Sequence, residues 1–168
     1  MEQILKLNPD NITDEVAATF LRTRFTVRGV VFDENKNVAL LPVTAQHYHA
    51  LPGGGIEEGE SWIEALRREC QEEIGVDVSV IQELGLVLEY RVEFSLVQTS
   101  YCYVGKAVGQ KQKPIFTQHE LDKGLEEAIW IPLDEAIILM ESEVDNNQGK
   151  YIIERDTFLL KKVKALRI

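Results

Sequence analysis

The segment between residues 51 and 76 constrains the fold most strongly, because its sequence marks where a loop ends and a helix begins and stops. It opens with Leu51-Pro52-Gly53-Gly54-Gly55, a proline and three glycines that break regular structure. Ser61 and Glu64 then have the spacing of a capping box at a helix start. Gly75 stands where a helix commonly ends in the left-handed conformation. The sequence therefore predicts a glycine-rich loop that leads directly into a helix.

This helix is predicted to have two distinct faces. One face is apolar and buried, and its residues recur at helical spacing: Ile63, Leu66, Cys70 and Ile74. Beside it converge the carboxylates of Glu69, Glu72 and Glu73. Like charges this close repel each other unless a cation lies between them, and Mg²⁺ prefers carboxylate oxygens. On the three glutamates alone, a solvated acidic helix face is the simpler interpretation.

The residues before the helix favour a cation site instead. Gly53, Gly54 and Gly55 let the backbone approach a ligand or a metal closely, which a Cβ would obstruct. Glu60 can form an ion pair with Arg68 and so tie the loop to the helix. A loop held in this way would keep its carbonyls and amides directed at a phosphate next to the cation.

The rest of the chain predicts a mixed sheet flanked by helices. Strands are expected at 23–32, 38–41, 76–81, 84–92, 94–108 and 129–131, and residues 109–128 are expected to form an exposed loop. Helices are expected at 13–22, after Asp134, and at the end of the chain, where Phe158, Leu159, Val163 and Leu166 would face inwards. With 168 residues and no internal repeat or linker, the chain suits one α/β domain spanning residues 1–168, with a short N-terminal helical extension over about 1–22.

Charge and composition limit the functions that the chain suits. Its net charge of −10 disfavours a protein that binds nucleic-acid backbones, although a phosphate substrate remains suitable if cations mediate the contact. No apolar run approaches the roughly 20 residues of a membrane helix, and the first residues lack a secretory signal, so the predicted location is the cytoplasm. In that compartment Cys70 and Cys102 favour two buried thiols over a disulfide.

A known family matches this pattern. Gly54, five residues, Glu60, seven residues, and then Arg68-Glu69-Cys70-Gln71-Glu72-Glu73-Ile74-Gly75-Val76 resemble the complete signature of the Nudix hydrolases over residues 54–76. Cys70 is a mild departure, because the family usually has an aliphatic residue there. Trp130-Ile131-Pro132-Leu133-Asp134-Glu135 resembles the family's late strand and helix start. The resemblance implies an α/β/α sandwich with a central mixed sheet.

The resemblance also implies a chemistry, namely Mg²⁺- or Mn²⁺-dependent hydrolysis of a nucleoside diphosphate linked to another group. Carried over by position, Glu69, Glu72 and Glu73 would be metal ligands together with the Gly53 carbonyl. Glu60, Arg68 and Gly75 would be structural. The metal would lower the pKa of a bound water and neutralise phosphate charge.

The general base and the phosphate contacts are less closely specified. Glu69 is the first choice for the general base, and Glu72 is counted with it among the catalytic carboxylates. Some relatives take the base from a later loop. In this chain that loop offers Glu120, Glu126 or Glu127, of which Glu120 is preferred. Substrate phosphates would contact the backbone of Gly53, Gly54 and Gly55 and a basic side chain from Arg22, Arg24, Arg28 or Arg91. Arg28 is the preferred one, because an arginine in the middle of a strand is hard to place unless it lines a cleft.

The substrate is left open, with a lean towards a nucleoside triphosphate or an oxidised nucleotide and with His49, Phe25 or Tyr48 as base contacts. The rival interpretation is a Nudix-fold sensor that binds a nucleotide without cleaving it. An isoprenoid diphosphate isomerase would need a catalytic cysteine, for which Cys102 is the candidate. The expected partner is a small nucleotide rather than a nucleic acid or a membrane, and the family also allows a homodimer.

Overall fold

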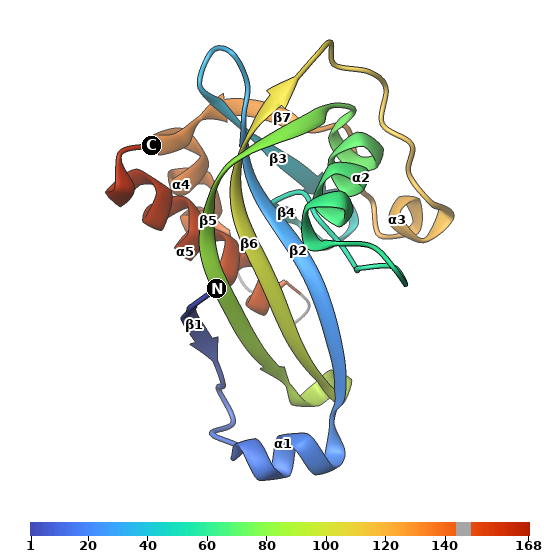
Figure 1. Ribbon diagram of the computed structural model, residues 1–168, viewed down its shortest axis with the longest axis vertical. Coiled ribbons are helices and arrows are strands. Elements are labelled where there is room, and N and C mark those ends of the chain that lie inside the picture. Colours follow the sequence, from blue (N-terminus) through green and yellow to red (C-terminus); the bar gives the residue numbers. More distant parts are fainter. Residues whose placement is uncertain (144–148) are drawn as a thin grey trace.

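The computed structural model describes residues 1–143 and 149–168, and Figure 1 shows helices on both sides of a twisted sheet. The helices are α1 (Asp14–Phe20), α2 (Trp62–Ile74), α3 (Gln118–Asp122), α4 (Leu133–Ser142) and α5 (Lys150–Leu166). The strands are β1 (Gln3–Leu7), β2 (Arg22–Phe32), β3 (Asn37–Val43), β4 (Tyr48–Ala50), β5 (Asp77–Arg91), β6 (Leu96–Val108) and β7 (Ile129–Pro132). Thr44–Gln46 and Val92–Phe94 form short 3-10 turns.

Within the described residues seven strands form one mixed sheet in the order β1-β5-β6-β2-β3-β4, with β7 paired to β3. β2 lies parallel to β6 and β1 parallel to β5, whereas β5 and β6 are antiparallel. β2 meets β3 only at Phe32 and Val38, next to their connecting turn. The remaining edge of β2 is covered by the glycine loop, since Val27 N–H donates to the Gly54 carbonyl at 2.9 Å and Gly29 N–H to the Pro52 carbonyl at 3.0 Å. Divergence of β2 and β3 thus makes room for this loop.

Two apolar clusters hold the layers together. One joins α2 to one face of the sheet and contains Val27, Val31, Leu66, Cys70, Ile74 and Tyr103. The other joins α4 and α5 to the opposite face and contains Val30, Val87, Cys102, Met140, Leu159, Leu160 and Val163. Figure 1 shows α2 on one side of the long strands and the α4–α5 pair on the other. The predicted α/β fold with a central mixed sheet is confirmed.

Both predicted ends of α2 form. The Ser61 hydroxyl accepts a hydrogen bond from the Glu64 N–H, and the Glu64 carboxylate accepts one from the Ser61 N–H at 2.9 Å. Gly75 ends the helix with φ of +67°. The predicted buried stripe is wrong at Ile63, which is 45% exposed, because the packed face is rotated towards Ala65.

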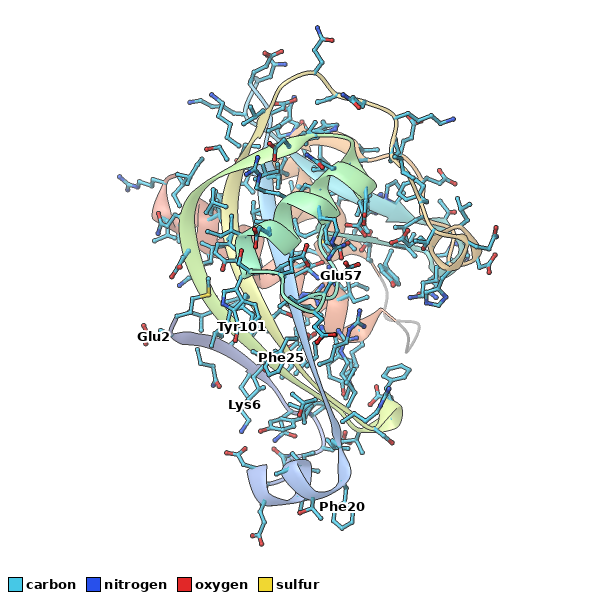
Figure 2. The ribbon with its side chains drawn as sticks, turned by 45° about the vertical axis from the view of Figure 1, so that its right-hand side comes forward. Glu2, Lys6, Phe20, Phe25, Glu57 and Tyr101 are labelled. Atoms are coloured by element: carbon cyan, nitrogen blue, oxygen red, sulfur yellow. The ribbon has the colours of Figure 1, made fainter. Side chains whose placement is uncertain are left out.

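The first turn of α2 also anchors a group of aromatic rings. Trp62 stacks on Tyr101 with ring centroids 3.8 Å apart, and Phe25 lies 6.4 Å from both rings. Figure 2 shows Phe25 and Tyr101 beside each other on the sheet. These contacts involve Phe25 in packing on the α2 side of β2.

Four other predictions about the fold need correction. The N-terminal extension is not mainly helical, because Gln3–Leu7 forms a strand parallel to β5 and only Asp14–Phe20 is helical. The strands expected at 76–81 and 84–92 are one strand, β5, with irregular register near residues 81 and 84. The expected loop 109–128 contains α3, and Leu166 is 45% exposed although it was expected to face inwards.

The prediction for the two cysteines is confirmed. Cys70 and Cys102 are buried free thiols, as expected. None of the described helices combines the length and the apolar character needed to span a membrane.

Candidate active site

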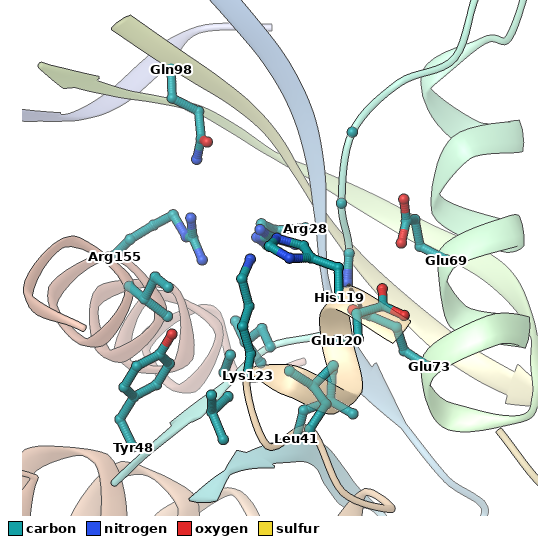
Figure 3. A pocket seen from close by; sticks show the side chains of 18 of the residues that line it. Arg28, Leu41, Tyr48, Glu69, Glu73, Gln98, His119, Glu120, Lys123 and Arg155 are labelled. Carbon is teal, nitrogen blue, oxygen red and sulfur yellow. Dashed lines mark hydrogen bonds between the residues drawn. The ribbon is translucent and has the colours of Figure 1, made fainter. Parts of the chain in front are cut away.

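A cleft of about 300 Å³ lies where the glycine loop, the C-terminal half of α2, the N-terminal turns of α5 and the α3 segment meet. Figure 3 shows Glu69 and Glu73 on one side of it, Arg155 and Gln98 on the other, and Arg28 between them. The opposite chemical character of the two sides follows from the elements that supply them. α2 supplies carboxylates, whereas the strands and α5 supply cations.

The glycine loop fits against α2 with no space for side chains at two positions. A Cβ on Gly54 would stand 2.3 Å from Glu69 Oε1. Gly53 has φ of +136°, and a Cβ there would stand 2.2 Å from the Val27 carbonyl oxygen. At Gly53 the positive φ and the backbone clash both require glycine, whereas a side chain at Gly54 would displace the Glu69 carboxylate from its present position.

The glutamates that face this loop are buried acids. Glu73 Oε2 accepts a hydrogen bond from Gly53 N–H at 2.7 Å, yet burial raises the pKa of Glu73 to about 8, against the opposing effect of the nearby Arg28 charge. Burial also raises the pKa of Glu69, with Arg68 acting in the opposite direction. Each of the two carboxylates further raises the pKa of its neighbours by like-charge repulsion. Burial therefore disfavours the charged form of both acids, although Arg68 and Arg28 partly offset this effect.

Arg68 holds the outer part of this cluster. Its Nε and Nη2 donate to Glu60 at 2.9 and 3.0 Å, which is the ion pair expected from the sequence, and Nη2 also donates to the Gly55 carbonyl at 2.9 Å. Its Nη1 donates to Glu69 at 2.9 Å and to Glu72 at 3.2 Å. One guanidinium thus ties the loop to the helix and orients two of the acidic side chains.

The fit of a cation can be judged from these donors. Across residues 1–143 and 149–168, no three carboxylate, histidine or cysteine side chains already surround one point as a metal-binding group. Glu69 and Glu73 are nevertheless two neighbouring buried carboxylates that line the cleft with Gly53, and no hydrogen bond to the Gly53 carbonyl is found among the described residues. Oxygen donors of this kind suit a hard divalent cation. Glu72 is half exposed and turned towards Arg68.

The α3 segment supplies one more carboxylate. Glu120 lines the cleft, and its carboxylate accepts hydrogen bonds from the N–H and hydroxyl of Thr117 at 2.6 and 2.8 Å. Glu126 and Glu127 are exposed and lie outside the cleft lining. Of the three alternative bases from this region, the structure brings only Glu120 to the cleft.

Of the basic side chains predicted to bind phosphate, again only some line the cleft. Arg24, Arg28 and Arg91 line the cleft, whereas Arg22 does not. Arg28 Nε is buried without a hydrogen-bond partner among the described residues. Burial lowers the pKa of Arg28 to about 10, so the side chain stays charged at neutral pH. A buried charge with a free donor is what an anion-binding arginine requires.

Of the residues suggested to contact the nucleotide base, only some lie at the cleft. Tyr48 lines the cleft together with Leu41, Val43, Leu125 and Ile152, which give it an apolar wall. His49 does not line it, because its N–H and Nδ1 contact the Glu143 carboxylate at 3.1 and 2.5 Å. Phe25 belongs to the ring group on the other face of β2.

Sequence reasoning missed Gln98, Lys123 and Arg155, all of which line the cleft. A signal for Arg155 exists, since Arg155 and Asp156 interrupt the otherwise apolar inner face of α5, which carries Tyr151, Leu159, Leu160 and Val163. Two charged residues on such a face are buried only when they are paired or functional. Gln98 and Lys123 carry no comparable signal.

Fold and cleft together define an α/β protein in which an acidic helix faces arginines across a glycine loop. A family model described as the NUDIX domain matches residues 22–154. The chain belongs to the NUDIX family.

Individual known proteins agree with this assignment. An RNA pyrophosphohydrolase of Aeromonas hydrophila is 38% identical over 87 residues, which are 50% of this chain and 47% of that protein. The 8-oxo-dGDP phosphatase NUDT18 of Danio rerio is 33% identical over 98 residues, 51% of this chain and 30% of that protein. The chain therefore spans about half the length of these relatives or less. A NUDIX hydrolase from Nitrosomonas europaea shares the fold with a TM-score of 0.66 at 18% identity, covering 86% of this chain and 90% of that one.

Proposed function

We propose that this chain hydrolyses a diphosphate linkage in a nucleoside diphosphate derivative with the help of Mg²⁺ or Mn²⁺. The observation that carries the proposal is the pair of buried carboxylates, Glu69 and Glu73, facing Arg28 across the glycine loop. A divalent cation would satisfy the carboxylates, and the arginine would bind the phosphate that bridges the two sides. NUDIX family membership supports the same reaction.

Each residue has a role in this proposal. Glu69, Glu72, Glu73 and the Gly53 carbonyl hold the cation, which supplies charge neutralisation and a more acidic water when bound. The backbone of Gly53, Gly54 and Gly55 lies against the phosphates, and Arg28 binds their oxygens. Glu60, Arg68 and Gly75 keep the loop and the helix in register.

Glu69 is our first choice for the group that accepts the proton of the attacking water, because its carboxylate faces the loop beside Gly54. Glu120 is the second, because it lines the same cleft. The carboxylate of Glu120 is engaged by Thr117 in the cap of α3, so it would have to leave that cap to act as a base.

For the substrate we propose a nucleoside triphosphate or an oxidised nucleotide. The cleft has several cations for a phosphate chain and an apolar wall for a base, built by Leu41, Val43, Tyr48, Leu125 and Ile152. One relative is named 8-oxo-dGDP phosphatase, and 8-oxo-dGDP is an oxidised nucleotide, which supports that part of the proposal. Another is named RNA pyrophosphohydrolase, which supports hydrolysis of a diphosphate linkage.

Cys102 gives no support to the isomerase alternative. Its side chain is fully buried and burial raises the pKa of its thiol to about 12, so it is a poor nucleophile. It also lies outside the cleft lining. A Cys102→Ala variant is expected to keep the hydrolase activity.

The proposal is tested by incubating the protein with Mg²⁺ and a panel of nucleotides and measuring released phosphate and pyrophosphate. Turnover by the wild type, and a loss of several orders of magnitude in Glu69→Gln, is the expected result. Glu64→Gln is the matched control, because Glu64 lies on the same helix but is exposed and serves the helix cap. Tight nucleotide binding without turnover would favour the sensor, and near-normal rates in Glu69→Gln would refute the assigned role.

A further inference from the structure

The side of the cleft away from α2 contains a buried arginine with unused hydrogen-bond donors. Arg155 on α5 is fully buried, and its Nε donates to Asp156 Oδ1 at 2.6 Å. Its Nη1 lies 3.5 Å from Glu89 Oε2 without forming a hydrogen bond, and neither Nη1 nor Nη2 has a hydrogen-bond partner in the described parts of the chain. Figure 3 shows the guanidinium of Arg155 directed into the cleft. Buried donors of this kind need an acceptor.

Neighbouring groups hold Arg155 in place and add to the positive charge. Glu89 is buried and accepts hydrogen bonds from Arg91 Nη2 at 2.9 Å and from Gln98 Nε2 at 2.7 Å. Arg91 Nε is itself buried and unpartnered within residues 1–143 and 149–168. With Arg28, three guanidinium groups line this side against the two carboxylates of Glu89 and Asp156. Four guanidinium nitrogens of these residues, Arg28 Nε, Arg91 Nε, Arg155 Nη1 and Arg155 Nη2, are buried without a hydrogen-bond partner in the described part of the chain.

We propose that Arg155, with Arg91, binds a phosphate group of the substrate beyond the two that flank the scissile linkage, and so selects triphosphates over diphosphates. This inference rests on the proposed function, and it adds a specificity-determining residue outside the segment 54–76. A phosphate fits better than a carboxylate, because it carries more charge and more acceptor oxygens for the two guanidinium groups of Arg155 and Arg91. The nucleoside base has the apolar wall around Tyr48 instead.

Measuring the binding of inorganic phosphates in the absence of metal tests this subsite independently of the hydrolysis reaction. With EDTA present, calorimetry on the wild type should show that inorganic tripolyphosphate binds about tenfold or more tightly than pyrophosphate. Arg155→Gln should remove this preference, and Arg155→Lys, which keeps the charge but loses the planar fork, should retain part of it. Lys161→Gln is the control, because Lys161 is an exposed residue of the same helix paired with Glu141.

Kinetics with Mg²⁺ give a second measurement. For a nucleoside triphosphate the KM of Arg155→Gln should rise about tenfold with little change in kcat, while the KM for the diphosphate stays constant. Equal affinity of the wild type for tripolyphosphate and pyrophosphate would overturn the inference even if Arg155→Gln does not fold. A folded Arg155→Gln, or an Arg155→Lys, with the full wild-type preference would overturn it too. A third result would also overturn the inference: UDP-glucuronate binds more tightly than UDP-glucose, and tripolyphosphate shows no preference over pyrophosphate. The subsite would then bind a carboxylate rather than a phosphate.

Discussion

Glu73 allows a quantitative test, because its burial and its hydrogen bond with the Gly53 backbone are both defined in the structure. The side chain is 6% exposed and accepts a hydrogen bond from Gly53 N–H. Burial raises its pKa from an ordinary 4.5 to about 8, although Arg28 and the Gly53 N–H act in the opposite direction. Without a cation, folding therefore favours the protonated form of this acid. Replacing Glu73 by glutamine keeps the shape and an oxygen acceptor but removes the charge.

The size of the effect follows from the two pKa values. The unfolded chain ionises Glu73 near pH 4.5, and the folded chain ionises it only near pH 8. The stabilising contribution of the protonated form is complete below pH 4.5 and is lost as the pH rises towards 8. At about 1.4 kcal/mol per pKa unit, the wild type should lose about 2 kcal/mol of unfolding free energy between pH 6 and pH 8. At pH 7, metal-free Glu73→Gln should be more stable than the wild type by about 3 kcal/mol.

Urea unfolding followed by tryptophan fluorescence at pH 6 and pH 8 in EDTA measures this difference. Glu72→Gln is the matched control, because Glu72 lies on the same helix with a half-exposed side chain. Saturating Mg²⁺ at pH 8 should raise the unfolding midpoint of the wild type but not that of Glu73→Gln. Equal pH slopes for wild type and Glu73→Gln would refute the reasoning, since Glu73 would then be hydrated in the folded state.

Two further substitutions test the frame around the cluster. Glu60→Gln should cost about 1–2 kcal/mol of unfolding free energy, because Arg68 loses a charged partner while keeping its contacts with the helix, and the urea midpoint measures the loss. Gly75→Ala should cost at least about 2 kcal/mol, because its φ is +67° and a Cβ would stand 1.9 Å from the Gln112 carbonyl oxygen. Gly59 has a similar φ of +82°, but a Cβ there would meet open space, so Gly59→Ala measures the cost of the backbone conformation alone. An equal loss of unfolding free energy in both variants would show that the clash at Gly75 contributes nothing.

The parts of the molecule that could be predicted from the sequence are those set by local interactions. Ser61, Glu64 and Gly75 act within a few residues of themselves, so the ends of α2 follow from the sequence alone. The ion pair of Glu60 with Arg68 also spans a short stretch of chain. The same locality explains the error at Ile63: spacing defines an apolar face, but the sheet decides how far that face is rotated.

Features formed between segments distant in the chain could not be predicted from the sequence. β1 is recognisable only through its partner β5, because five residues with little alternation do not mark a strand by themselves. Arg155 lies 3.5 Å from Glu89 on β5, which in turn accepts a hydrogen bond from Gln98 on β6. No spacing in the sequence shows that these residues meet.

The chemistry of the cleft is likewise a product of the sheet and not of the helix alone. β2 leaves β3 at Phe32, and its free edge binds the glycine loop through Val27 and Gly29. That attachment brings the Gly53 N–H to Glu73 and leaves no space for a side chain between Gly54 and Glu69. Burial of the two acids, and with it their raised pKa values, therefore depends on strand divergence elsewhere in the sheet. An isolated α2 peptide would carry the same glutamates in water, where nothing would distinguish them from an ordinary acidic helix face.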